Sequence, residues 1–117
     1  MNQEIKPQAG GDFKVVSPIE RALAAQTTDI TSTLNERGER YGKFKDHAEV
    51  TQSLKALIKA KMGDKWYRLA NDQRESLEMI CHKIGRIVNG DPNYADSWVD
   101  IAGYAKLVAD RLEGVER

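Results

Sequence analysis

This sequence cannot form a disulfide bond within one chain, because its 117 residues include a single cysteine, Cys81. It also lacks an apolar run long enough to cross a bilayer. Its first residues lack the apolar core of a secretory signal. We therefore expect a cytoplasmic protein without membrane association. Cys81 lies in an apolar helical stretch, where a small buried side chain is expected rather than a nucleophile.

An excess of charge of either sign is also missing. Lysine and arginine together number 18, as do aspartate and glutamate. A general nucleic-acid binder normally needs a basic excess to neutralise phosphates, so we exclude that class. A small nucleotide remains an acceptable ligand, since a few local groups can hold it. Hydrophobic residues make up 40% and charged residues 31%, which is typical of a globular chain with room for one domain.

No stretch of four or more residues has a strand pattern, and no internal repeat is visible, so the sequence predicts an all-α protein. Residues 1–16 are polar and include Pro7, Gly10 and Gly11, which predicts a flexible arm before one helical domain over residues 17–117. A helix should begin after Ser17, which can cap it, while Glu20 completes a capping box.

Helices are predicted over several ranges. The first should run to about residue 26 and be interrupted at residues 27–29, where Asp29 caps a second short helix that ends before Gly42. The next should span residues 46–62, followed by a hydrophobic connection at Trp66, Tyr67 and Leu69. The last two, over residues 72–89 and 93–112, form a long antiparallel αα-hairpin, across which the helix at 46–62 packs.

Each helix of the hairpin carries an apolar stripe that is expected to be buried. The stripes consist of Leu77, Ile80, Ile84, Ile87 and Val88 on the first helix, and of Trp98, Ile101, Ala102, Ala105, Val108 and Leu112 on the second. A chain of this length buries only a thin core. We therefore expect a second copy to complete the helical bundle, so that the protein is a homo-oligomer.

Polar residues lie opposite these stripes. At about 100° per residue, one sector of the first helix holds Glu75, Glu78, His82, Arg86 and Asn89. A similar sector of the second holds Asp96, Asp100, Gly103 and Asp110. The simplest interpretation is a solvated face. The alternative is a carboxylate cluster, which would repel itself unless a cation such as Mg²⁺ or Mn²⁺ lies between its members. Such an ion would activate water for phosphoanhydride hydrolysis.

The polar residues near this sector suggest contacts for a nucleotide. Lys83, Arg86 and Lys106 could hold phosphates, or could simply be solvated. Asn89 and Tyr104 are further candidate nucleotide contacts. Gly103 has no side chain and would permit close approach of a ligand or another helix.

The two histidines each have two interpretations. His82 follows Glu78 by one turn and is either a metal ligand or base, or a partner of that carboxylate. His47 lies near the start of its predicted helix and either caps or packs there, or belongs to the site.

Residues 75–108, with the upstream stretch 36–50, resemble a family of small phage and prophage proteins that has no settled function. The signature of that family is W-x-D-I-A-G-Y-A, matched here by Trp98, Asp100, Gly103 and Tyr104. The resemblance covers roughly residues 30–112. It implies that the protein works in the cytoplasm of a host cell.

A more distant resemblance is to the MazG-like all-α nucleoside triphosphate pyrophosphohydrolases. Their E-x-x-E and E-x-x-D motifs bind Mg²⁺ and release pyrophosphate from a nucleotide. Glu75 and Glu78 match the first motif, and Asp100 matches the last position of the second. Tyr104 matches an aromatic residue one turn later. Ser97 stands where the motif has glutamate, and the adjacent Asp96 points about 100° away, which puts full metal binding in doubt.

Three functions follow as hypotheses. In the first, Glu75, Glu78 and Asp100, assisted by Asp96, hold Mg²⁺ or Mn²⁺ for hydrolysis, while Lys83 or Lys106 neutralises the developing charge. In the second, the chain binds or sequesters a small nucleotide without catalysis and so counters host signalling or defence. In the third, it is an interaction module that inhibits a host enzyme through the N-terminal arm or the region of Trp66 and Tyr67.

Overall fold

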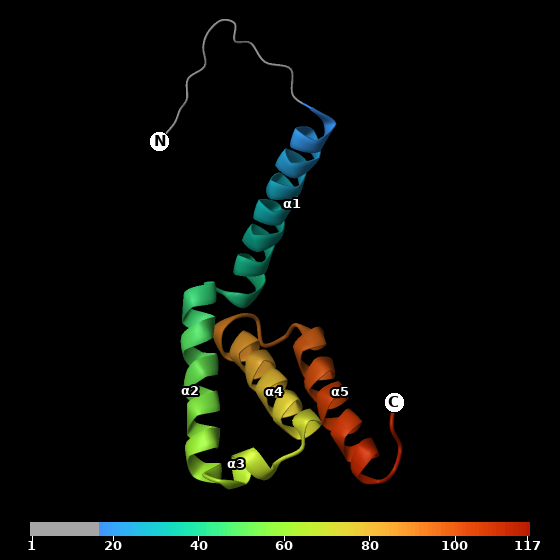
Figure 1. Cartoon of the computed structure of the whole chain (residues 1–117). Coiled ribbons are helices and arrows are strands. Elements are labelled where there is room, and N and C mark those ends of the chain that lie inside the picture. Colours follow the sequence, from blue (N-terminus) through green and yellow to red (C-terminus); the bar gives the residue numbers. More distant parts are fainter. Residues whose placement is uncertain (1–16) are drawn as a thin grey trace, which may run out of the picture. The chain divides into compact units, whose positions relative to one another are not determined.

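The computed structural model describes residues 17–117, except for the side chains of residues 24–28. This part of the chain contains five helices and no strand (Figure 1). They are α1 (Pro18–Tyr41), α2 (Phe44–Met62), α3 (Lys65–Arg68), α4 (Asn71–Asn89) and α5 (Ala95–Leu112). The predicted all-α class is confirmed, whereas the predicted arm over residues 1–16 lies outside the described residues. None of the described helices is both long and apolar enough to span a membrane.

Helix α1 begins where the sequence predicts. The Ser17 amide donates to Glu20 Oε1 over 2.9 Å, and the Glu20 amide donates to Ser17 Oγ over 3.1 Å, which completes the capping box. The predicted interruption at residues 27–29 is wrong, because α1 continues to Tyr41. Threonine and aspartate inside a helix each cost only a few tenths of a kcal/mol, about 0.7 at most, which the flanking helix formers outweigh. The predicted break at Gly42 is confirmed, with a φ of 81°.

The chain divides into two compact units, Met1–Asn35 and Glu36–Arg117, and α1 extends from one into the other. In the first unit, the described residues form the first part of α1, whose Ile19, Ile30 and Leu34 are exposed. The second unit holds the end of α1 and all of α2 to α5. The candidate metal and nucleotide residues from the sequence all lie in the second unit.

In the second unit, α4 lies between α2 and α5 and packs against both (Figure 1). Two ion pairs show that α4 and α5 run antiparallel. Asp72 near the start of α4 pairs with Arg111 near the end of α5, while Lys83 further along α4 pairs with Asp100 near the start of α5. The predicted antiparallel hairpin is therefore confirmed.

Small and polar side chains make the closest contacts of α4. Among the described residues, the buried hydrophobic side chains are Trp66 and Cys81, whereas the buried polar ones are His47, Thr51, Ser76, Lys83 and Ser97. Gly85 shows how close α2 comes. A Cβ atom on Gly85 would lie 2.5 Å from Thr51 Oγ1 and 3.0 Å from His47 Cε1, so only a glycine fits without a shift.

The hairpin stripes are not buried within one chain, and their predicted burial in an oligomer stays a prediction. Ile80, Ile84 and Ile101 are half-buried, Ala105 is exposed, and 55% of Trp98 is exposed. The reason lies in how the helices approach each other. Because Ser76, Gly85 and Ser97 let helices come close, α2 and α5 take two nearly opposite sides of α4, and its large apolar side chains face a third side that no described helix covers.

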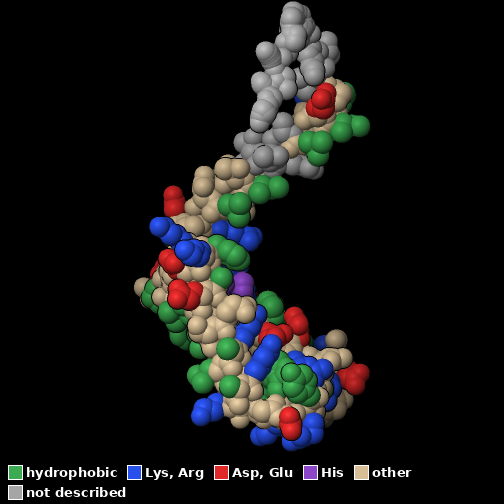
Figure 2. Space-filling model, turned by 60° about the vertical axis from the view of Figure 1, so that its left-hand side comes forward, with side chains coloured by type: hydrophobic (Ala, Val, Ile, Leu, Met, Phe, Trp, Pro, Cys, Tyr) green, Lys and Arg blue, Asp and Glu red, His purple; other side chains and the backbone are tan. Residues whose placement is uncertain are grey.

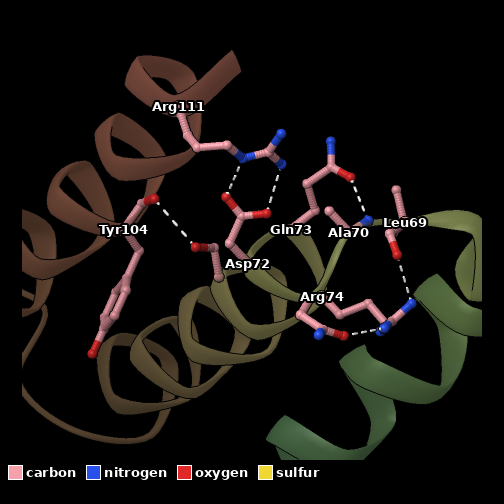
Figure 3. A network of polar contacts seen from close by, with 9 residues as sticks. Leu69, Ala70, Asp72, Gln73, Arg74, Tyr104 and Arg111 are labelled. Atoms are coloured by element: carbon pink, nitrogen blue, oxygen red, sulfur yellow. Dashed lines mark hydrogen bonds and ion pairs between the residues drawn. The ribbon is translucent and has the colours of Figure 1, made fainter. Parts of the chain in front are cut away.

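Polar contacts fasten the start of α4 (Figure 3). Arg111 donates from Nε to Asp72 Oδ2 over 2.7 Å and from Nη2 to Asp72 Oδ1 over 2.6 Å. Arg74 donates to the carbonyl oxygen of Leu69 over 2.7 Å, which ties α4 to the segment after α3. The predicted hydrophobic connection, residues 66–69, thus includes part of α3. Its Trp66 is buried, while Tyr67 is exposed.

Candidate functional site

The carboxylates of the predicted metal site bind separate partners within one chain. Glu78 lies 3.2 Å from Lys59 of α2, whereas Asp100 lies 3.0 Å from Lys83 of α4. Asp96 accepts a hydrogen bond from the hydroxyl of Tyr94 over 2.9 Å. Glu75 is exposed on α4. Over the part of the chain that the structure describes, no three His, Cys, Asp or Glu side chains are placed to hold one metal ion. That these carboxylates converge across two subunits stays a prediction.

The cause of this separation is the orientation of α4. The sequence pattern treats the sector with Glu78, His82 and Asn89 as opposite to the packing side of the helix. In the structure this sector contacts α2 and the segment before it, through Lys59, His47 and the Lys43 carbonyl. The sector is thus an interface between helices, which explains why its acid is paired with a lysine.

Lys83 is the least expected member of the predicted site. Its side chain is 11% exposed, and its ammonium bonds Asp100 across the α4–α5 contact. A buried ammonium needs a counter-charge, which Asp100 supplies. The charge of Asp100 is therefore neutralised by Lys83, the role that the metal hypothesis gave to a bound cation.

The other predicted nucleotide contacts are engaged elsewhere. Asn89 donates to the carbonyl oxygens of Tyr41 and Lys43 over 3.0 and 3.1 Å, which joins the end of α4 to the α1–α2 link. Lys106 pairs with Asp110 one turn later over 3.1 Å. The guanidinium of Arg86 lies 4.2 Å from the centre of the Tyr41 ring.

Tyr104 and Gly103 also have local explanations. Tyr104 accepts a hydrogen bond from Ser76 Oγ through its backbone oxygen over 3.3 Å (Figure 3). A Cβ atom on Gly103 would meet nothing within 4 Å, so no described segment makes the close approach that its lack of a side chain permits.

The structure brings together two residues that the sequence does not connect, His47 of α2 and His82 of α4. His47 Nε2 lies 3.3 Å from His82 Nδ1, and the ring centres are 4.6 Å apart at an angle of 81°. Burial lowers the pKa of both rings, and the pKa of His82 falls to about 4 because His47 and nearby cations add to the effect. Since the two residues are 35 positions apart, no local pattern could have paired them.

Cys81 lies beside this pair in the sequence and is buried, as predicted. Burial raises the pKa of its thiol, an effect that Lys55 opposes and Glu78 supports. The thiolate is the nucleophilic form of cysteine, so an environment that disfavours the thiolate makes Cys81 an inert side chain rather than a catalytic one.

A second feature missed by the sequence analysis is an open apolar surface, here named the α4–α5 apolar face. By helical spacing it comprises Leu77, Ile80, Ile84 and Val88 of α4, together with Trp98, Ile101, Ala105, Val108 and Leu112 of α5. A groove of about 280 Å³ runs along it, lined by side chains of both helices such as Leu77, Ile80, Ala105 and Val108. Figure 2 shows the molecule from the side on which α2 lies, where hydrophobic side chains at the surface are mixed with acidic and basic ones.

Comparison with known proteins places the chain in a family. The family described as "Domain of unknown function (DUF6378)" matches residues 26–112, which is more than half of the chain. The chain therefore belongs to this family. No curated protein and no solved structure matches it.

Proposed function

We propose that this member of a family without an assigned function is a homotypic interaction module, in which the α4–α5 apolar face of one copy packs against the same face of a second copy. The observation that carries this proposal is the exposure of that face. Val88 is 64%, Trp98 55% and Leu112 59% exposed, although each belongs to an apolar stripe.

The size of the face suits a protein partner. Two helices of 18 and 19 residues, side by side, offer an area of roughly 27 by 19 Å, or about 500 Å². The largest apolar patch on a typical monomer is about 300–600 Å² and is often functional. The protein would leave this apolar area in water without a partner, at a cost of about 25 cal/mol per Å².

A second copy is the occupant that the chemistry of the face favours. None of its nine members is charged, so a two-fold axis through it brings no like charges together. A two-fold pairing also places α4 and α5 of each copy in one four-helix bundle, an arrangement in which apolar stripes form the centre. Aliphatic stripes with the indole of Trp98 supply the large apolar side chains that interface centres use.

The hydrolase hypothesis receives less support from the geometry. A metal ion held by Glu78 and Asp100 would have to displace Lys59 from one carboxylate and Lys83 from the other. Glu75 is exposed on α4 and would bind a metal only together with groups of another copy. The interaction hypothesis needs no such rearrangement. The contact regions suggested by the sequence were the N-terminal arm, which lies outside the described residues, and the region of Trp66, which is buried, and Tyr67, which is exposed; the proposal uses the α4–α5 apolar face instead.

The test is the molar mass of the full chain in solution, measured by light scattering over micromolar concentrations. We expect a dimer. Ala105→Glu places a charge in the groove and should give a monomer with unchanged helix content, while Ala60→Glu on exposed α2 is the matched control and should stay dimeric. A wild-type monomer at these concentrations would overturn the proposal, as would an Ala105→Glu variant that remains a dimer.

A further inference from the structure

The contact between His47 and His82 lies on the α2 side of α4, away from the α4–α5 apolar face. His47 is 5% exposed, and its Nδ1 makes no hydrogen bond of ordinary length with any described residue. Thr51 Oγ1 lies 3.4 Å from its Nε2, and Gly85 of α4 closes over the ring. His47 is therefore held in a tight space that has room for a neutral ring.

The geometry of the pair suits two neutral rings that share one N–H hydrogen bond. A neutral imidazole has one N–H donor and one acceptor nitrogen, so one ring can donate to the other across the 3.3 Å between His47 Nε2 and His82 Nδ1. An imidazolium has N–H groups at both nitrogens. If both rings were protonated, two N–H groups would face each other at this distance, and the contact could not persist.

The charged groups nearest the pair also oppose protonation. Lys55 of α2 and Lys83 and Arg86 of α4 all disfavour a positive charge on His82, in addition to the larger effect of burial. For His47, burial is again the largest effect and lowers its pKa; the backbone of Gly85 raises it, and Arg86 and Lys55 lower it by smaller amounts. A first proton on either ring would therefore add a cation to a partly buried site that already faces cations.

Two carboxylates on the described parts of α4 and α5 are already paired with lysines. Glu78, one turn before His82 on α4, is bound to Lys59 of α2. Asp100 of α5 is bound to Lys83. Because Glu78 and Asp100 already pair with lysines, neither of these two is available as a counter-ion to an imidazolium.

We propose that the His47–His82 contact is an acid-sensitive latch, which holds α2 against α4 while both rings are neutral and releases α2 as the rings take up protons. Release would open the α2–α4 contact where it covers Cys81. The thiol of Cys81 is 2% exposed and borders Lys55 and Ile58 of α2 together with Trp66 of α3. Its accessibility therefore reports directly on the state of the latch.

The chain is well suited to test this latch, since it contains only two histidines and one cysteine. The experiment measures the reaction rate of Cys81 with 4,4′-dithiodipyridine, which still reacts with thiols in mild acid. The rate for the full folded chain is divided by the rate for the chain in denaturant at the same pH, which removes the pH dependence of the thiol itself. The ratio gives the fraction of time for which α2 is open.

For His82 alone, a pKa moved from 6.5 to about 4 predicts that this ratio rises roughly 30-fold between about pH 7.5 and pH 5. His82→Gln keeps a hydrogen-bonding side chain that takes up no proton, so we expect most of the rise to disappear. Glu75→Gln, on an exposed position of α4, is the control and should keep the full rise. An unchanged ratio in the wild type, or a full rise in His82→Gln, would overturn the latch.

A second measurement needs no variant and covers the case in which His82→Gln fails to fold. The ring resonances of the two histidines are followed by NMR in the native chain as the pH falls. We expect both rings to stay neutral well below pH 6.5 and to become charged only as the native signals of α2 weaken. Titration of either ring near pH 6.5 without change in α2 would contradict the proposal.

Discussion

The ammonium of Lys83 lies 3.0 Å from Oδ2 of Asp100, and this pair spans the contact between α4 and α5. The side chain of Lys83 is 11% exposed and that of Asp100 is 44% exposed, so the lysine depends on this aspartate more than the aspartate depends on the lysine. The sequence motif assigned Asp100 to a metal ion. In the structure an internal cation already neutralises it.

Replacing Asp100 by asparagine should destabilise the fold, because it leaves the Lys83 ammonium in a buried place without its counter-charge. We expect a loss of roughly 1–3 kcal/mol, between the values for exposed and buried ion pairs. Urea denaturation measures it. Asp96→Asn, also on α5, is the control and should change stability little, since Asp96 is exposed. A gain in stability for Asp100→Asn would instead indicate crowded carboxylates that need a metal.

Metal-dependent hydrolysis is expected to be absent. Incubation of the full chain with a panel of nucleoside triphosphates and Mg²⁺ or Mn²⁺ should release no pyrophosphate above the background without protein. The physical reason is that Glu78 and Asp100 are bound to Lys59 and Lys83 and point to different sides of α4. Turnover that requires the metal and is lost in Glu78→Gln would contradict this expectation and restore the hydrolase hypothesis, with a site assembled between copies.

Local signals in the sequence predicted several helix ends correctly, although the interruption predicted at residues 27–29 is absent. The Ser17 capping box, Gly42 and Gly90 mark boundaries through contacts within a few residues, and the structure has boundaries at these places. The buried side of α4 was not predictable in the same way. Periodicity identifies the apolar side of a helix, but it does not show that a glycine such as Gly85 lets a neighbour approach on another side.

The partners of the candidate site residues were not predictable for a related reason. The motif residues Glu78 and Asp100 were correctly placed on the two helices of a hairpin, but their partners come from tertiary contacts with Lys59 and Lys83. Nothing in the spacing of the acids reveals these lysines.

Substitution by alanine is expected to have opposite effects on stability at Gly85 and at Gly103. Gly85→Ala should destabilise the fold by roughly 1–3 kcal/mol, because its Cβ would lie 2.5 Å from Thr51 Oγ1 and force α2 away. Gly103→Ala should stabilise it by about 0.5–1 kcal/mol, because the position is helical and its Cβ meets nothing within 4 Å. Thermal or urea denaturation measures both. A destabilised Gly103→Ala chain would show that a second copy packs closely at this glycine.

Stability should fall in two separate steps as the pH is lowered. The first step comes from the histidines. Their pKa values are lower in the folded chain than the ordinary 6.5, so the unfolded chain binds more protons below that pH. The stability that the neutral histidines contribute is therefore fully present above pH 6.5. It is lost as the pH falls from 6.5 towards about 4, the pKa of His82.

The second step comes from carboxylates whose pKa is lowered in the fold. The hydrogen bonds from Arg111 lower the pKa of Asp72, and those from Arg117 and Lys106 lower the pKa of Asp110. Their contribution is present above the ordinary value of 3.8 and is lost below it, as the pH falls through the folded pKa. Urea midpoints at closely spaced pH values measure both steps. His82→Gln should reduce only the first step and Asp72→Asn only the second. Loss of the first step in Asp72→Asn would assign it to the Asp72–Arg111 ion pair instead of the histidine pair.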